Sequence, residues 1–450
     1  MKGILDKGFN PMITVFRGFE ENVNKVGGQK IAIAIERNKG QISRIDMEIF
    51  KDDTGHDEEN FKIAERMTKA LLWVHGGYKI IVGGSDIVGN RLKVAYTEKG
   101  IRAFDADFMS TVYEKQFTVE IVPYDKVPAA YEKSEAVGRM LNGNCIGFDA
   151  GGSDRKVSAV IDGKPVFSEE VVWHPKKNSD PSYHYAGILD AMKTAASHLP
   201  KVDKIGVSTA GVVIDNRMMV GSLFIKVSKE DFDKHVKNIY LDVAKELGGV
   251  PINVANDGDV TALAGSMELN DGGVLGIAMG TSEAGGYVDK GGNITGRLNE
   301  LAFVPVDFNE SAMVDEWSGD YGCGVKYFSQ DAVIKLAPMA GIDLDESLTP
   351  AEKLKVVQGL MKEGSEAARK IYETIGVYFA YAIAFYSMFY EIKHVLILGR
   401  VTSGDGGVVI LENANRVLRE EFPDLFSKIK LHIPDENSRR VGQSIAAASL

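Results

Sequence analysis

The sequence has few cysteines, and they are not spaced for metal or disulfide chemistry. Only two occur among 450 residues, Cys145 and Cys323, and no Cys-x-x-Cys pair is present. A disulfide framework or a zinc ribbon needs several cysteines at short spacings, so neither is indicated. Such sparse use of cysteine is typical of a reducing cytoplasm, where we expect the protein to work.

Positive charge is also scarce. The chain carries 52 Lys and Arg against 63 Asp and Glu, which gives a formal net charge of -11 at pH 7. A nucleic-acid partner usually requires a basic surface, so this balance argues against one while leaving a local basic patch open. Small anionic ligands remain open, because glycine-rich loops and helix N-termini bind phosphate without net positive charge.

Long apolar runs are missing as well. The most apolar helical stretch, residues 376–390 (GVYFAYAIAFYSMFY), falls short of the roughly 20 residues that a membrane-spanning helix needs. The first residues have neither an uninterrupted apolar core nor a small-residue cleavage site, so they do not resemble a signal peptide. We therefore predict a buried core helix over 376–390 and no membrane partner.

The order of predicted elements indicates an α/β protein of two or three domains. Block boundaries near 141 and 250 predict three parts, residues 1–141, 142–250 and 251–450. In the first block, alternation and helical spacing predict two hairpin strands, a helix and a strand at 30–36, 41–50, 58–75 and 78–82. A similar order recurs in the second block, so the first is a candidate degenerate partial repeat, although such arrangements are also common in unrelated proteins.

Four short segments place polar side chains and glycines at the ends of predicted strands. The first contains Asp149, Gly151, Gly152 and Ser153. Glycines allow backbone N–H groups to approach phosphate oxygens, and a carboxylate suits magnesium held through water. The alternative is an ordinary hairpin turn, in which glycines are also frequent.

The second and third segments offer a base and further phosphate donors. Asn256 and Asp257 follow a predicted strand, where a carboxylate can remove a proton from a substrate hydroxyl. An aspartate there can instead only cap the helix that follows. Gly280, Thr281 and Ser282 follow the next strand and can donate to phosphate, or they can form a plain hairpin turn.

The fourth segment contains Gly399 and Arg400 after the last long strand. Glycine there leaves room for a flat base, and an arginine can stack on adenine or pair with phosphate. A tight surface turn is again the alternative. All four segments lie at the C-terminal ends of predicted strands, which is where open α/β sheets bind their ligands.

Together these segments resemble the two phosphate motifs, the catalytic motif and the adenosine motif of actin-like sugar kinases. The residues that carry the resemblance are Asp149–Ser153, Asn256-Asp257, Gly280–Gly286 and Gly399–Gly407. The ROK family (repressors, open reading frames, kinases) is the most similar, over about 144–450. The resemblance implies a two-lobed actin-like, ribonuclease H-like α/β fold, to which this chain adds an N-terminal α/β block.

The resemblance also implies roles for individual residues. Asp257 would be the catalytic base, Asn256 and Glu300 would bind sugar hydroxyls, and Asp149 would hold magnesium through water. The ATP-binding residues would be Asp149, Gly151, Gly152, Ser153, Gly280, Thr281, Ser282, Gly399 and Arg400. ATP and magnesium are therefore the expected cofactors, and a small sugar is the expected partner.

The sequence departs from the family pattern at the zinc site and in a phosphate motif. Phe303 stands where many family members have a zinc-binding histidine, and the family's cysteine cluster is reduced to Cys323. We therefore expect no zinc. Glu283 stands within the second phosphate motif, where it would repel phosphates unless it points away.

These observations predict an ATP-dependent phosphotransferase that acts on a hydroxyl of a small sugar. The first alternative is a non-catalytic ROK-like sugar sensor or regulator. ROK repressors carry an N-terminal helix-turn-helix, whereas the first block here is rich in predicted strands. The second alternative is a binding module without turnover, whose first block serves in dimerisation or as a lid. A homodimer stays open under each of these hypotheses.

Overall fold

The computed structural model describes residues 5–133, 137–434 and 436–450, with no side chains described from 435 to 441. Its internal contacts divide the chain into two compact units. Unit 1 comprises Met1–Lys133, Ile277–Gly285 and Arg297–Ile433, and unit 2 comprises Ser134–Gly276, Gly286–Gly296 and Pro434–Leu450. Both units are discontinuous in sequence, whereas the three predicted blocks follow one another along the chain. The division into those blocks stays a prediction.

The N-terminal part of unit 1 is built on a four-stranded sheet with the order β2-β1-β3-β4. Its strands are β1 (Gly28–Glu36), β2 (Ile42–Phe50), β3 (Lys79–Gly83) and β4 (Thr118–Val122). The predicted hairpin at 30–50 is confirmed, because β1 and β2 pair antiparallel. Its turn needs left-handed backbone at Lys39 and Gly40, where φ is 58° and 67°.

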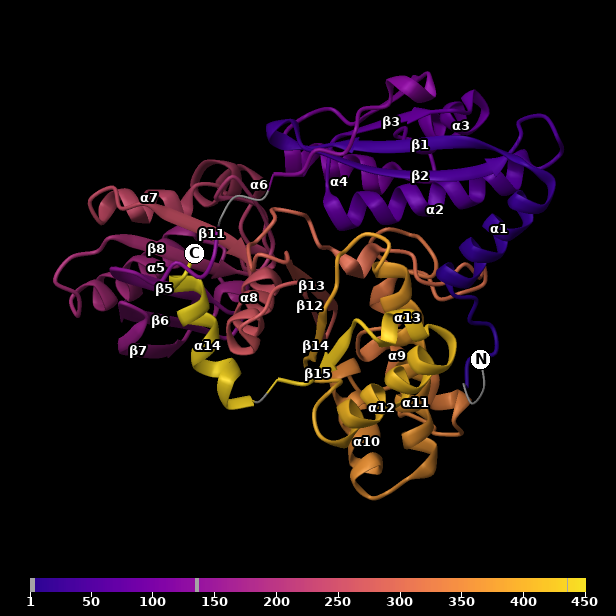
Figure 1. The fold of residues 1–450 in the computed structure, drawn as a ribbon. Helices are drawn as coiled ribbons and strands as arrows, with labels where there is room; N and C mark the ends of the chain where they lie inside the picture. The colour runs from indigo at the N-terminus through magenta and orange to yellow at the C-terminus, as the bar shows by residue number, and fades with distance from the viewer. Residues whose placement is uncertain (1–4, 134–136, 435) are drawn as a thin grey trace. The chain divides into compact units, whose positions relative to one another are not determined.

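Four helices accompany this sheet. They are α1 (Met12–Val26), α2 (Asp57–His75), α3 (Asp86–Ala95) and α4 (Ala103–Tyr113). The predicted helix over 58–75 is confirmed as α2, which packs against β1 and β2 (Figure 1). The helix α1 was not predicted, although its buried residues recur at helical spacing: Met12, Ile13, Phe16, Phe19 and Val23.

The remainder of unit 1 contains most of a second sheet and a group of helices. The sheet has the order β13-β12-β14-β15, with β12 (Val274–Met279), β13 (Glu283–Val288), β14 (His394–Leu398) and β15 (Lys430–His432). The helices are α9 (Gln330–Met339), α10 (Pro350–Lys362), α11 (Glu366–Tyr386), α12 (Asp405–Glu421) and α13 (Pro423–Phe426). In the described part of the chain, no helix has the length and apolar character needed to cross a membrane.

The helix α11 confirms the prediction of a buried core helix in the apolar stretch. Every residue from Ile375 to Tyr386 is buried. The helix packs against α1, α10 and α12, so its aromatic side chains are enclosed by helices on several sides. It begins at a cap, because the Ser365 hydroxyl accepts a hydrogen bond from the Ala368 N–H.

A buried ionic cluster joins the N-terminal part of unit 1 to the segment around residue 320. Asp320 accepts hydrogen bonds from Arg66 at 2.6 and 3.1 Å and from Lys69 at 2.5 Å, and its ion pair with Arg102 measures 2.8 Å. Lys69 is fully buried and also lies 3.6 Å from the Cys323 sulfur. Close partners are needed here, because an unpaired buried charge is costly.

Phe303 lies in an aromatic group of unit 1, at the position where the ROK family resemblance would place a zinc ligand. Its ring centre is 4.3 Å from that of Trp73 and 5.7 Å from that of Phe104. The Trp73 indole N–H donates to Asp105 at 2.7 Å, so the buried tryptophan keeps a polar partner. Side chains from the N-terminal part of the chain therefore fill this region.

Unit 2 is built on a five-stranded sheet with the order β11-β8-β5-β6-β7. Its strands are β5 (Asn144–Ala150), β6 (Asp154–Ile161), β7 (Lys164–Val172), β8 (Lys204–Thr209) and β11 (Ile252–Asn256), and β9 (Val212–Ile214) pairs with β10 (Arg217–Val220) beside them. Its helices are α5 (Pro181–Ala196), α6 (Lys229–Asp231), α7 (Ile239–Glu246), α8 (Asp257–Leu269) and α14 (Glu436–Ala448). Strands β5, β8 and β11 run parallel, so their C-terminal ends meet at one edge.

The strand directions leave the repeat hypothesis open. The strand β3 pairs antiparallel with β1, whereas β8 pairs parallel with β5, and β5 pairs antiparallel with β6. The strand directions agree between the two sheets if β1 is matched to β6 and disagree if it is matched to β5, so the repeat stays a prediction.

The C-terminal helix α14 packs across β5, β6 and β8 (Figure 1). Glycines in two neighbouring strands allow this approach. A Cβ atom on Gly147 would lie 1.8 Å from the Ser444 carbonyl oxygen, and one on Gly206 would lie 1.7 Å from the Ala447 carbonyl oxygen. This helix was not predicted, although it brings side chains from the end of the chain to the middle of the sheet.

Candidate functional site

Two predicted carboxylates lie in unit 2 where the parallel strands end. Asp149 is near the end of β5, and Asp257 is the first residue of α8, directly after β11. The Ser208 hydroxyl on the neighbouring strand β8 donates to Asp149 Oδ1 at 2.7 Å. Asp149 is buried, while Asp257 is partly exposed. The sheet therefore places both acids at the edge where α/β proteins bind their ligands.

The surroundings of these two acids disfavour their charged forms. Burial raises the pKa of Asp149 to about 6, and the Asp257 charge adds to that effect, although the Ser208 hydroxyl and Lys156 oppose it. Burial also raises the pKa of Asp257, against backbone hydrogen bonds and the charge of Lys176. Raised values are what a carboxylate base that works near neutral pH requires.

In this segment the residue that caps the helix is Asn256 and not Asp257. Asn256 caps α8, because its Oδ1 accepts from the Gly258 N–H at 2.7 Å and its Nδ2 donates to the Gly211 carbonyl at 2.7 Å. Asp259 is buried and accepts from the Tyr287 N–H at 3.0 Å. Asn256 is therefore the capping residue, while the Asp257 carboxyl group meets the Gly258 N–H and its own N–H in the first turn of α8. The predicted contact of Asn256 with sugar stays a prediction.

Gln443 was missed by sequence reasoning and lies beside this group. Its Nε2 donates to Thr261 Oγ1 at 3.2 Å, to the Asp257 carbonyl at 3.3 Å and to Ser208 Oγ at 3.5 Å. The residue comes from α14, more than 180 positions after Asp257 in the chain. It ties the C-terminal helix to α8, which begins at Asp257, and to β8, whose Ser208 hydroxyl holds Asp149. No local pattern around Gln443 indicates this role.

The first glycine segment forms the turn between β5 and β6. The Gly151 carbonyl accepts from the Trp173 indole at 2.8 Å, and the Ser153 hydroxyl donates to Asp154 at 2.9 Å. Gly152 is exposed, and an added Cβ would meet only Lys176. The turn is thus open toward solvent at the glycine that was predicted to approach phosphate.

The third and fourth segments come together in unit 1. Gly280, Thr281 and Ser282 form the turn between β12 and β13, and Gly399 follows β14. The Val401 N–H donates to the Met279 carbonyl at 3.0 Å, which joins the two turns. Gly399 has a φ of 104°, and an added Cβ would lie 2.4 Å from the same carbonyl, so this contact requires glycine.

The side chains at these two turns are accessible. Thr281, Ser282 and Arg400 are exposed, so their hydroxyl and guanidinium groups are free to meet a ligand. The Arg400 carbonyl accepts a hydrogen bond from the Gln358 side chain at 2.7 Å. This bond fixes the backbone, while the Arg400 side chain stays exposed to solvent. Roles in ATP binding stay predictions for all of these residues.

Glu283 is buried, and its surroundings disfavour a negative charge at the turn. It follows Ser282, is 4% exposed, and has no hydrogen-bond partner for either carboxyl oxygen among the described residues. Burial and the neighbouring charge of Glu300 raise its pKa well above its ordinary value. In its protonated form, which burial favours, Glu283 would not repel phosphates. Glu300 is partly exposed, and its predicted sugar contact stays a prediction.

The acids of unit 2 fit a magnesium ion that arrives with a nucleotide. In the described part of the chain, no group of three or more His, Cys, Asp or Glu side chains is placed to hold a metal ion. Magnesium bound with phosphates keeps several waters and needs only one or two carboxylates. Asp149 therefore suffices for the predicted contact through water, since it lies beside an open glycine turn.

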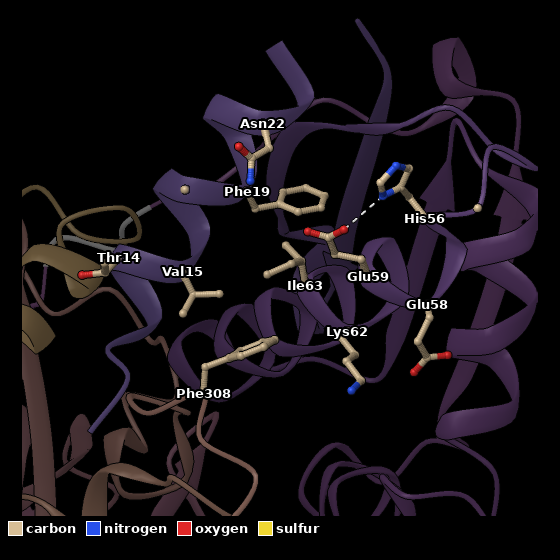
Figure 2. Close-up of a pocket in the computed structure, with 12 residues that line it drawn as sticks. Thr14, Val15, Phe19, Asn22, His56, Glu58, Glu59, Lys62, Ile63 and Phe308 are labelled. Atoms are coloured by element: carbon tan, nitrogen blue, oxygen red, sulfur yellow. Dashed lines mark hydrogen bonds and ion pairs between the residues drawn. The ribbon is translucent and has the colours of Figure 1, made fainter. Parts of the chain in front are cut away.

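A separate pocket of about 560 Å³ lies in the N-terminal part of unit 1 (Figure 2). Phe19, Ile63 and Phe308 give it an apolar wall, while His56 and Glu59 pair at 3.2 Å on its rim. Its volume is within the range of small-molecule sites. None of the predicted site residues lines it, so it is distinct from the candidate catalytic group.

The comparisons with known proteins support the fold. No protein-family model matches the sequence, and a search of curated proteins found no match. The structure is similar to a ROK hexokinase from Thermus thermophilus, with 17% identity and a TM-score of 0.52, covering 68% of this chain and 96% of that one. It is also similar to a ROK family transcriptional regulator, a homologue of the E. coli Mlc protein, with 17% identity and a TM-score of 0.51, covering 69% and 78%.

These neighbours define the class of protein by its fold. The chain has the α/β, actin-like two-lobed fold of ROK hexokinases, as the motifs predicted. About a third of the chain lies outside the aligned region of either neighbour. One neighbour is a kinase and the other a regulator, so the fold is compatible with both activities.

Proposed function

We propose that the protein is a ROK-family kinase that transfers the terminal phosphoryl group of ATP to a hydroxyl group of a small sugar. The observation that carries this proposal is the pair Asp149 and Asp257. Both lie at the C-terminal edge of a parallel sheet beside an open glycine turn, and the pKa of each is raised. Asn256 rather than Asp257 is the N-cap residue of α8, and Asp257 is partly exposed, which suits a base that meets a substrate.

Asp257 removes the proton from the attacking sugar hydroxyl in this proposal. The hydroxyl oxygen forms a bond to phosphorus, the bond from phosphorus to the bridging oxygen breaks, and ADP leaves. The proton moves to Asp257, which releases it to solvent after transfer. A base of this kind contributes about 10²–10⁴-fold to the rate.

Asp149 would hold magnesium through water, and the ion would neutralise phosphate charge when it is bound with ATP. Ser208 holds the Asp149 carboxylate in place through its 2.7 Å hydrogen bond. The backbone of Gly151 and Gly152 then offers N–H groups to phosphate oxygens. In unit 1, the turn at Thr281 and Ser282 supplies hydroxyl donors, and the exposed guanidinium of Arg400 is available to adenine or phosphate. Positioning of this kind provides most of the catalysis in phosphoryl transfer.

The test is a measurement of ADP release over a panel of hexoses, amino sugars and polyols with ATP and magnesium. We expect turnover with at least one sugar, and a loss of about 10²–10⁴-fold in kcat for Asp257→Asn. Asp343→Asn, which changes an exposed aspartate in unit 1, serves as the control and should retain activity. Absence of turnover across the panel, or equal rates for the two variants, would contradict the proposal.

A sugar-responsive regulator is the second candidate, because one of the two neighbours is a ROK regulator. Such a protein would bind promoter DNA and release it when sugar is added. Residues 5–122 here form mainly the β2-β1-β3-β4 sheet and its helices, and the net charge is -11. Retarded migration of DNA fragments that sugar relieves, without ADP release, would favour this candidate over the kinase.

A further inference from the structure

We infer that Lys176 is a phosphate-binding residue of this protein, and that its ammonium group contacts the phosphoryl group at the turn of Gly151 and Gly152. This inference rests on the proposed function and adds a residue that none of the sequence motifs contains. Lys176 lies in a short 3₁₀ turn, Pro175–Lys177, between β7 and α5. Lys176, the glycine turn and the two acids all lie in unit 2.

The side chain of Lys176 reaches the glycine turn. A Cβ atom built on Gly152 would lie 3.3 Å from Lys176 Cε and 3.5 Å from its Nζ. Apart from residues 151–153 themselves, no other described atom lies within 4 Å of that position. The missing side chain at Gly152 thus leaves the space into which the lysine extends. The ammonium group stands at the place where a phosphate oxygen would approach the backbone.

The backbone under Lys176 is tied to the same turn. The Trp173 N–H donates to the Ser153 carbonyl at 3.1 Å, and its indole donates to the Gly151 carbonyl at 2.8 Å. The fully buried ring of His184 hydrogen-bonds to the Pro175 carbonyl at 3.0 Å. These contacts fix the 3₁₀ turn against the glycine turn, so the position of the lysine follows from buried neighbours.

The charge of Lys176 is available to a ligand. Its ammonium group makes no hydrogen bond or ion pair with the residues that the structure describes. The other lysine near the turn, Lys156, is engaged with Asp154 at 3.2 Å. Three acids, Asp149, Asp154 and Asp257, surround the turn, and a phosphoryl group would add further negative charge. An unpaired cation favours binding of that group, and Lys176 provides one.

The test compares Lys176→Met, Lys176→Arg and Lys177→Met in the full chain. Lys177 is the matched control, because it is an exposed lysine in the same turn and does not contact Gly152. We expect Lys176→Met to lower kcat by about 10²–10³-fold, as the loss of a charge-stabilising donor does elsewhere. Lys176→Arg should restore part of the rate, and Lys177→Met should match the wild type.

A pH profile separates a phosphate contact from a structural role. The Lys176 charge lowers the pKa of Asp257, so its removal should move the acid limb of kcat/KM to higher pH. Lys177→Met should leave the limb in place. Equal kcat values and equal acid limbs for Lys176→Met and Lys177→Met would overturn the inference.

The role of Lys176 can be wrong while the protein is still a sugar kinase. Conversely, Lys176 can bind phosphate although the protein is not a sugar kinase, and this outcome can also be measured. If the wild type phosphorylates no sugar, calorimetry with magnesium and ADP or tripolyphosphate still tests the lysine. Weaker binding by Lys176→Met than by Lys177→Met would then support phosphate contact without kinase activity. Equal binding by the two variants would overturn it.

Discussion

Two groups of buried acids in this protein have opposite surroundings. In unit 1, Asp320 lies among Arg66, Lys69 and Arg102; burial raises its pKa, but the three cations outweigh this and hold the pKa well below its usual range. In unit 2, Asp149 has one hydroxyl partner and no such ring of cations, and its pKa rises to about 6. The first arrangement stabilises the fold, whereas the second leaves an acid ready to exchange a proton or bind a cation.

The largest effect is expected at Asp257, where substitution should lower activity without lowering stability. Asp257→Asn should lower kcat by about 10²–10⁴-fold while leaving the free energy of unfolding unchanged or higher, because it removes a charge that burial disfavours. Paired measurements of ADP release and urea denaturation would show both. A large loss of stability in this variant would show that Asp257, like Asp320, has a structural role.

The second-largest effect is expected from a substitution that breaks the ionic cluster of unit 1. Asp320→Ala leaves three buried cations without their shared partner, so we expect a loss of about 3–5 kcal/mol in the free energy of unfolding. Denaturation in urea at pH 7.5 measures it. The control is Glu310→Ala, which removes an exposed ion pair with Lys62 and should change stability little. Similar results for the two variants would show that the cluster does not hold unit 1 together.

A smaller effect of opposite sign is expected at Asp149. Its folded pKa is raised, so ionisation costs stability as pH rises from about 4 to about 6, and the cost persists above that range. Asp149→Asn should therefore stabilise the protein by up to about 3 kcal/mol at pH 7.5, and by less at pH 4.5. Equal effects at both pH values, or destabilisation at pH 7.5, would show that burial does not disfavour the ionised form of Asp149.

The smallest expected effect concerns the hydroxyl beside Asp149. The Ser208 hydrogen bond lowers the pKa of Asp149, so Ser208→Ala should move that pKa further upward. Carboxyl resonances followed by NMR during an acid titration would report it. An unchanged or lower pKa would mean that the hydroxyl does not stabilise the carboxylate.

The sequence predicted the elements whose patterns are local. The hairpin at 30–50, the helix α2 and the buried helix α11 follow from alternation, helical spacing and apolar composition. The four polar segments were also located correctly at strand ends. By contrast, α14 and the residue Gln443 were missed, because their role depends on packing across a sheet formed much earlier in the chain.

The order of residues alone determined where the strands and helices with a clear local pattern form, and which acids stand at strand ends. Only the tertiary structure decided what each acid does, since its pKa depends on burial and on partners far away in sequence. Asp320 meets Lys69 across 251 positions and loses protons readily, while Asp149 meets Ser208 across 59 positions and keeps them longer. The physical reason is that desolvation and Coulomb attraction act through space, where local sequence patterns carry no information.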